Sequence, residues 1–198
     1  MMNYFEITDD PSIQKRWHLE EPVFIGNKEA LDFWPLISGE RVDENVYKNI
    51  SAPIQYEGRS LNFTLGAFLI PYVRKDIGEV IREFAAPDVK LLPCLVGEKD
   101  LGFCVLIVEK KIKCLDLKKS IVDYYTHEDL AEEEEENKDP GKIGKIKGVI
   151  KARVDTSKIA ARDHIFRLEE NLSYLIVSGA LKEALQKKHI SGVSFKRV

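Results

Sequence analysis

The chain has 198 residues, of which 44% are hydrophobic and 32% are charged, a balance typical of a soluble domain with a highly charged surface. It has no apolar run long enough to cross a membrane, and the first ten residues lack the basic start and apolar stretch of a secretory signal, so we expect a cytoplasmic protein with no membrane partner. The net charge of −3 hides a split: residues 141–198 carry 13 Lys and Arg against 5 Asp and Glu, which leaves 17 against 28 for residues 1–140. The first part therefore predicts an acidic surface, which disfavours nucleic acid and attracts a basic protein partner.

The first 53 residues contain one clear strand and then a long irregular stretch. Residues 3–8 alternate as in a strand, and residues 9–12 end it as a turn. Residues 15–24 have no clear period, and residues 26–53 mix glycine, proline and scattered aromatics, so we expect at most short helical turns there. Because long irregular stretches are often binding surfaces, we name Trp17, Trp34 and Tyr47 as candidate partner anchors.

The middle of the chain predicts a helix and a hairpin. Residues 52–73 are rich in short strands, and a helix is predicted over about 74–85, where Gly78 costs roughly 1 kcal/mol relative to alanine. Residues 89–96 and 101–108 flank the turn signal "GEKD", and the wholly apolar residues 103–108 predict a strand covered on both faces. Two more short strands are predicted at 112–116 and 121–125.

An acidic segment at about 130–141 interrupts the strands. Glu132–Glu136 is a block of five like charges, which repel one another, so we expect a mobile loop. It is either a solvated insertion without a role or an acidic arm for a basic partner. Residues 145–153 then form a predicted strand with one basic face, which keeps a nucleic-acid-binding role open as an alternative. The nearby Gly–Lys pattern matches neither a complete phosphate loop nor a nucleic-acid-clamping module.

Residues 164–198 predict strand, turn, strand, helix and strand, with Ser178 capping a helix over about 178–188. At an offset of 104 positions, Tyr72–Leu92 aligns with Ile176–Lys196, which predicts a strand–helix–strand pseudo-repeat. The alternative is that any amphipathic helix followed by a strand aligns in this way. The whole pattern predicts an α+β fold, with a mostly antiparallel sheet and two amphipathic helices, and one domain over residues 1–198.

The reactive residue types do not form a recognisable site. Cys94, Cys104 and Cys114 lie in apolar, strand-like runs without a paired cysteine or a nearby histidine, so we expect reduced core residues and no metal. Four histidines are present, but the common hydrolase and metalloprotease motifs are not. We therefore expect a protein that is not an enzyme and needs no cofactor, although a small enzyme of unknown reaction stays an alternative.

Five segments, in this order and spacing, resemble immunity protein family eleven of bacterial polymorphic toxin systems, formerly a domain of unknown function: "RWHL" at 16–19, "DYYTHED" at 123–129, "GKIGKIKGV" at 141–149, "HIFRLEE" at 164–170 and the C-terminal residues 175–198. The resemblance runs from Tyr4 to Val198, and nothing is transferred to the acidic insertion at 131–140. It implies a cytosolic antidote that binds a cognate toxin and blocks it by occlusion, and it carries over no catalytic residue.

For such an antidote we expect a toxin with a basic contact surface. Charge complementarity supplies fast association, and buried aromatic or arginine anchors supply affinity. The candidate contact residues are Trp17, Trp34, Tyr47, Glu132, Glu133, Glu134, Glu135 and Glu136.

Overall fold

The structure is a computed structural model that describes residues 2–26, 31–40, 42–43, 45–132 and 138–198. One of its two main sheets has five strands in the order β10-β13-β14-β1-β15. All neighbouring strands are antiparallel except β10 and β13. The strands of this sheet are β1 (Tyr4–Asp9), β10 (Lys111–Ile112), β13 (Ile165–Leu168), β14 (Asn171–Ser178) and β15 (Val193–Arg197).

The other main sheet has six strands in the order β3-β4-β8-β9-β7-β6, antiparallel except between β4 and β8. They are β3 (Val23–Phe24), β4 (Ile50–Ala52), β6 (Phe63–Leu65), β7 (Pro71–Arg74), β8 (Val89–Val96) and β9 (Lys99–Val108). The predicted hairpin is confirmed as β8–β9, and residues 103–108 are all buried, as their unbroken apolar run predicted. Two small ribbons are β2 (His18–Leu19) with β5 (Ile54–Tyr56), and β11 (Ile121–Tyr124) with β12 (Ile146–Lys151).

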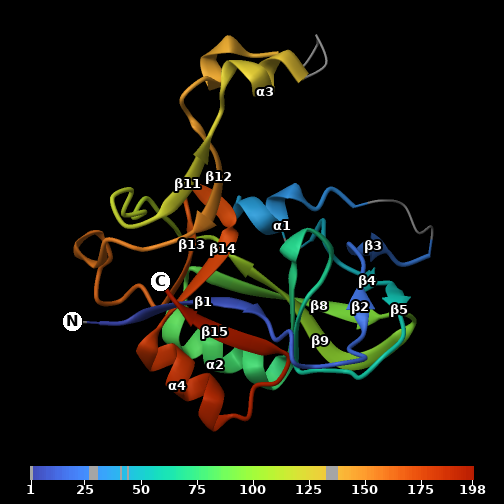
Figure 1. Ribbon diagram of the computed structural model, residues 1–198. Helices are drawn as coiled ribbons and strands as arrows, with labels where there is room; N and C mark the ends of the chain where they lie inside the picture. The colour runs from blue at the N-terminus through green and yellow to red at the C-terminus, as the bar shows by residue number, and fades with distance from the viewer. Residues whose placement is uncertain (1, 27–30, 41, 44, 133–137) are drawn as a thin grey trace.

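Two longer helices cover the sheets, and they match the two that the sequence predicts. α2 (Lys75–Ala85) and α4 (Gly179–Lys187) pack against each other and against the strands beside them (Figure 1). The Ser178 hydroxyl accepts the Leu181 N–H at 3.2 Å, which confirms the predicted cap. Gly78 keeps α2 close to the sheet, because a Cβ atom there would lie 2.8 Å from a Leu91 methyl group.

The described residues also contain shorter helical segments: α1 (Trp34–Ser38), α3 (His127–Glu132) and the 3-10 turns η1 (Ala67–Leu69), η3 (Pro140–Lys142) and η4 (Thr156–Lys158). The predicted α+β class with mostly antiparallel sheets is confirmed. The boundaries of the predicted acidic loop need correction, because α3 extends through Glu132 and η3 begins at Pro140. In the described residues, no helix is long and apolar enough to cross a membrane.

The predicted pseudo-repeat is present in the strand register. β7–α2–β8 and β14–α4–β15 are equivalent units, and in each a third strand lies between the two strands, antiparallel to both. That middle strand is β9 in the first unit and the N-terminal β1 in the second. Equivalent residues in the outer strands, β7 with β14 and β8 with β15, keep the offset of 104 residues. Equivalent rows are Val73–Cys104–Pro93 and Val177–Phe5–Arg197.

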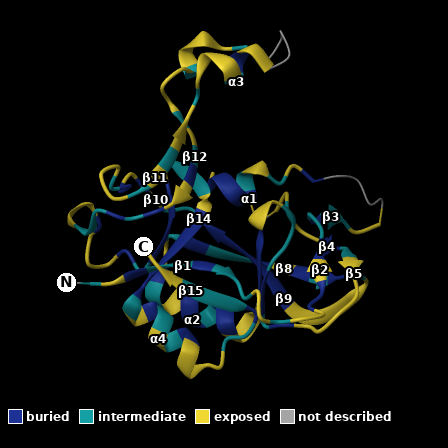
Figure 2. Ribbon diagram, in the orientation of Figure 1, coloured by how far each residue is buried: buried dark blue, intermediate teal, exposed yellow. Residues whose placement is uncertain are grey.

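The two sheets and the helix pair share one apolar core, which includes Val73, Ile81, Leu106, Val177 and Leu181. A second cluster, on the six-stranded sheet, contains Trp17 and Leu36 of α1. A third lies on the five-stranded sheet and reaches β12 through Val149. Figure 2 shows the buried central strands and the exposed projection that carries α3.

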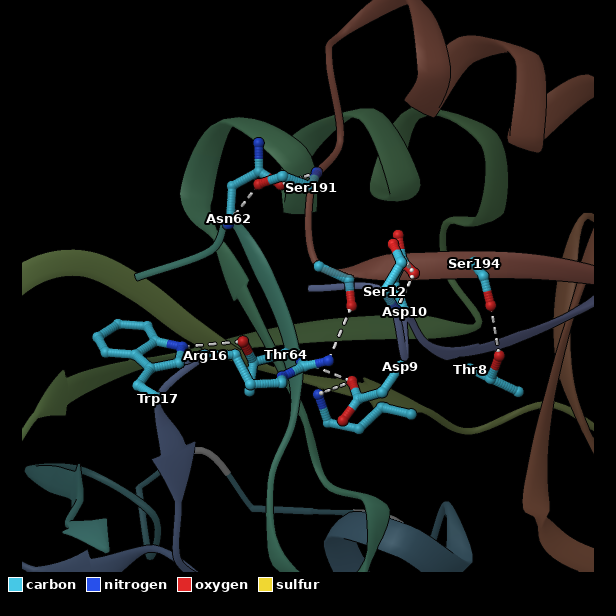
Figure 3. A network of polar contacts seen from close by, with 12 residues as sticks. Thr8, Asp9, Asp10, Ser12, Arg16, Trp17, Asn62, Thr64, Ser191 and Ser194 are labelled. Atoms are coloured by element: carbon cyan, nitrogen blue, oxygen red, sulfur yellow. Dashed lines mark hydrogen bonds and ion pairs between the residues drawn. The ribbon is translucent and has the colours of Figure 1, made fainter. Parts of the chain in front are cut away.

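A part-buried ion pair lies next to the link between the two sheets (Figure 3). The Arg16 guanidinium is buried and donates to Asp9 Oδ1 at 2.7 Å and to the Gly192 carbonyl at 3.2 Å. Asp9 Oδ1 also accepts the Leu65 N–H at 3.2 Å, so one carboxylate links β1 to β6. Gly192 has a φ of 102° and a Cβ there would lie 2.0 Å from the Phe63 carbonyl, so only glycine fits.

Candidate partner-binding surface

Large apolar side chains gather on the surface where α1 meets η1. Trp34 of α1 and Phe68 of η1 are 53% and 55% exposed, and Leu69 is also exposed. The Phe33 and Phe68 rings stack with their centroids 4.1 Å apart and their planes 11° apart. We call Phe33, Trp34, Phe68 and Leu69 the aromatic platform. Stacking of aromatic rings adds roughly 0.5–1.5 kcal/mol to simple burial.

Local sequence explains how α1 presents Trp34. The Asp32 carboxylate accepts the Trp34 N–H at 3.0 Å, and Pro35 stands in the first turn, where its missing N–H costs nothing. Leu36 is buried below, so Trp34 is left outside. The helix ends at Gly39 with a φ of 65°, where a Cβ would lie 2.5 Å from the Val108 carbonyl.

The η1 loop holds its two apolar residues in an unfavourable backbone conformation. Phe68 has a φ of 53° and Leu69 a φ of 59°, the left-handed region that bulky residues avoid. Such conformations cost about 1–3 kcal/mol each and are held only by the structure around them. Here the Gly66 N–H donates to the Ile70 carbonyl at 2.9 Å and closes the loop.

Carboxylates stand beside the platform. The Tyr47 hydroxyl donates to the Asp32 carbonyl at 3.2 Å, which places Tyr47 next to α1. Burial raises the pKa of Tyr47, and the nearby charges of Asp32 and Glu40 raise it further. Both carboxylates are exposed. The aromatic centre with an acidic edge suits a partner surface that is apolar in the middle and basic around it.

A second exposed feature is the arm, which we define as β11, α3, η3 and β12. It projects away from the two sheets (Figure 1). In the described residues, β11 and β12 pair only with each other, and the Tyr174 hydroxyl donates to the Val149 carbonyl at 2.8 Å near the base. Its apolar Ile150 is 66% exposed, and Ile121 and Tyr124 are exposed as well.

The tip of the arm is fixed by a capping box. The Thr126 N–H and hydroxyl donate to Asp129 Oδ2 at 2.7 and 2.8 Å, and Thr126 Oγ1 accepts the Asp129 N–H at 3.2 Å. Lys147 of β12 forms an ion pair with Asp129. The Lys147 ammonium, with the Thr126 donors, lowers the pKa of Asp129 to about 2. The start of α3 is thereby tied to the return strand.

The structure separates the predicted contact residues. Trp34 and Tyr47 lie at the platform, and Glu132 is the last residue of α3 at the arm tip. Glu133–Glu136 lie outside the described residues. Trp17 is instead 3% exposed, and its indole N–H donates to the Thr64 hydroxyl at 2.9 Å, so it is corrected here from a surface anchor to a core residue.

Sequence reasoning missed Phe68 and Leu69. The apolar run 67–70 has the composition of a strand, and its left-handed backbone depends on contacts with distant residues. The available signal is the bracket of Gly66 and Pro71 around the run, which is typical of a loop between two strands.

The basic face predicted for residues 145–153 is partly engaged within the protein. Lys147 pairs with Asp129, and the Arg153 guanidinium donates to the Ala152 and Arg197 carbonyls at 3.2 and 2.8 Å. Lys145 and Lys151 are exposed. Nucleic-acid binding draws its affinity from many simultaneous phosphate contacts, so this strand offers fewer cations than its sequence suggests.

The nucleophilic side chains of Ser178 and of the three cysteines are buried. His164 Nδ1 lies 2.9 Å from Ser178 Oγ, but Ser178 is fully buried and caps α4, so the pair does not present a nucleophile. Burial raises the pKa of Cys94 and of Cys114 to about 12, which keeps both thiols protonated. All three cysteines are free and buried. Within the described ranges, no group of three or more His, Cys, Asp or Glu could hold a metal ion.

A hollow of about 440 Å³ lies beside the C-terminal end of α2. Lys110, Arg162 and His164 line it together with Asp88. Asp163 is buried nearby and pairs with Lys110 at 3.4 Å. The mixture of signs favours no single class of ligand.

Comparison with known proteins identifies a family match for the second half of the chain. A family model described as "Immunity protein family (Imm11)" matches residues 97–198, which is just over half of the chain and includes the whole arm. The resemblance expected from Tyr4 onward is thus confirmed over these residues. No curated protein matches the chain.

Proposed function

Because this chain belongs to the Imm11 immunity protein family, we propose that it is a cytoplasmic antidote that binds one cognate toxin and blocks it by occlusion, without catalysis. The family match is the observation that carries this proposal. We take residues 1–198 as one domain that acts as a rigid scaffold for the contact surface. The toxin is expected to present a basic surface.

The platform and the arm support a division of labour in binding. Trp34 and Tyr47 are aromatic residues whose backbone N–H and hydroxyl, respectively, bond to Asp32, and such held aromatic residues suit a role in binding energy. Glu132–Glu136 add five like charges in consecutive positions of the sequence, which suits long-range attraction of a basic partner. Both regions are therefore proposed contact regions, with different effects on the kinetics.

Stoichiometry tests occlusion. The toxin domain encoded beside this chain's gene is mixed with increasing amounts of the purified protein, and residual toxin activity is measured. Occlusion predicts a linear loss that ends at a fixed molar ratio, with activity restored when the complex is dissociated. Loss at a small fraction of that ratio, persisting after separation, would instead show that the protein modifies the toxin as an enzyme.

Specificity for a protein partner is tested in parallel. The wild-type protein should bind the toxin domain and protect cells that express it, while Trp34→Ala and Tyr47→Ala should weaken both. Salt-sensitive binding to arbitrary DNA or RNA, without binding to the toxin domain, would contradict the proposal and favour the nucleic-acid alternative.

A further inference from the structure

The η1 loop combines two features that folding alone disfavours. Phe68 and Leu69 are consecutive residues with positive φ, and both expose large apolar side chains. Glycine or asparagine would occupy these φ values at lower cost, and polar side chains would suit an exposed loop. Strained backbone and exposed apolar surface at the same two residues point to a contact function.

The loop is held in this conformation from both sides. The Leu69 N–H donates to the Gly66 carbonyl at 3.1 Å, and the Ile70 N–H donates to the Ala67 carbonyl at 3.2 Å. At its base, a Cβ on Gly66 would lie 2.5 Å from the Tyr72 ring, so the backbone rests directly on a buried side chain. Phe68 stacks on Phe33 from the neighbouring segment. A loop fixed in advance loses little entropy when a partner covers it.

The carboxylates around the platform define the chemistry of the occupant. Asp32 and Glu40 are exposed beside Tyr47, and Asp32 also bonds the Trp34 backbone. A partner that covers the platform therefore meets the negative charges of Asp32 and Glu40 beside an apolar centre. Basic groups around an apolar pocket complement that arrangement.

We propose that Phe68 and Leu69 of η1, with Trp34 of α1, are the anchor that enters an apolar pocket on the basic face of the cognate toxin. This inference rests on the proposed function and adds the residues that carry the affinity. The anchor acts on the lifetime of the complex, because desolvated aromatic contacts at the centre of an interface control dissociation.

The test uses substitutions that fit the left-handed backbone. Phe68→Asn and Leu69→Gly remove the anchor side chains while tolerating positive φ, so the unfolding midpoint should stay unchanged or rise. Combined in the full-length protein, they should raise the Kd for the neighbouring gene's toxin domain by about 100-fold, mainly through faster dissociation. Leu117→Asn is the matched control, because Leu117 is 54% exposed and belongs to neither the platform nor the arm, and it should bind as the wild type does.

The outcomes separate this inference from the proposed function. If the wild type fails to bind the toxin domain, the proposed function fails and the inference fails with it. If the wild type binds and the double variant binds equally well, the inference alone is overturned. The inference is also overturned if sedimentation shows that the wild type is a dimer, and that the double variant is a monomer with unchanged toxin affinity. In that case a second copy of the chain covers the platform. If the double variant has a lowered unfolding midpoint, Trp34→Ala separates a loss of folding from the loss of a contact. This substitution leaves the η1 backbone untouched and should give the same faster dissociation.

Discussion

The indole of Trp17 is held by specific contacts in the core of the six-stranded sheet. It meets the Phe103 ring edge-on at 5.3 Å and donates to the fully buried Thr64 hydroxyl. We expect Trp17→Ala to lower the free energy of unfolding by about 3–5 kcal/mol, because it opens a cavity in a packed core. Trp17→Phe keeps most of the apolar area and should cost less. Urea denaturation measures the free energy of unfolding of both variants. Normal toxin binding by folded Trp17→Phe would confirm that Trp17 acts in the core. Lost binding by the folded variant would contradict that role.

The cysteines should respond to pH as buried neutral thiols. Burial raises the pKa of Cys94 and of Cys114 to about 12, and it also raises the pKa of Cys104. A thiol whose folded pKa exceeds its unfolded value stabilises the fold fully below about pH 8.5, and this contribution is lost as the pH rises toward 12. At pH 8 a thiol reagent should therefore label the protein in denaturant and spare it when native. Fast native labelling of any cysteine would show an accessible thiolate.

Among the elements, α4 depends on the burial of its inner face. Leu181 is fully buried in the core that α4 shares with α2 and both sheets. Leu181→Asp should abolish soluble folded protein, because an unpaired buried carboxylate costs several kcal/mol against a typical total stability of about 5–15 kcal/mol. The control is Gln186→Asp on the exposed face of the same helix, with an expected cost of about 1 kcal/mol or less. Equal thermal midpoints for the two variants would contradict the packing described here.

The Asp129 carboxyl at the tip of the arm makes the stability of the arm depend on pH. Asp129 has a folded pKa of about 2, below its unfolded value, so its stabilising contribution is present above about pH 4 and is lost as the pH falls toward 2. Lys147→Ala removes the largest cause and should move the carboxyl titration toward about 3.9, which NMR can follow. Lys145→Ala is the matched control on the same segment and should leave the titration in place. An unchanged titration in Lys147→Ala would show that the ion pair is not formed in solution.

Elements with strong local patterns were predictable from the sequence, and long-range partners were not. The amphipathic helix α2, the cap of α4 and the β8–β9 hairpin follow from neighbouring residues, so the sequence predicts all three. That β1 inserts between β14 and β15 depends on pairing across almost the whole chain. Trp17 and Trp34 both lie in aperiodic sequence, and only tertiary contacts decide that the first is buried and the second exposed. The exposed η1 residues were missed for the same reason.

On the scale of the whole molecule, the N-terminal strand ties the two pseudo-repeat units together. β1 is the middle strand of the second unit, and its last residue, Asp9, accepts the Leu65 N–H from β6 in the sheet of the first unit. The units also share the core between α2 and α4. The platform lies on the six-stranded sheet, and the arm is anchored on the five-stranded sheet through Tyr174. The Asp9–Leu65 bond and the shared core therefore connect the sheet that carries the platform with the sheet that anchors the arm.

The proposed division of labour between the platform and the acidic residues Glu132–Glu136 predicts opposite effects on the binding kinetics. Replacing Glu132–Glu136 by glycine and serine removes five charges that act at long range, so association with the toxin domain should slow by about tenfold at low salt and far less at physiological salt, where charges are screened beyond about 8 Å. Dissociation should hardly change, because an exposed ion pair is worth only about 0–1 kcal/mol. The platform variants should instead dissociate faster at both ionic strengths. Surface-binding kinetics at two salt concentrations separates these effects, and a loop variant that releases the toxin far faster while the aromatic variants bind normally would move the interface to the arm.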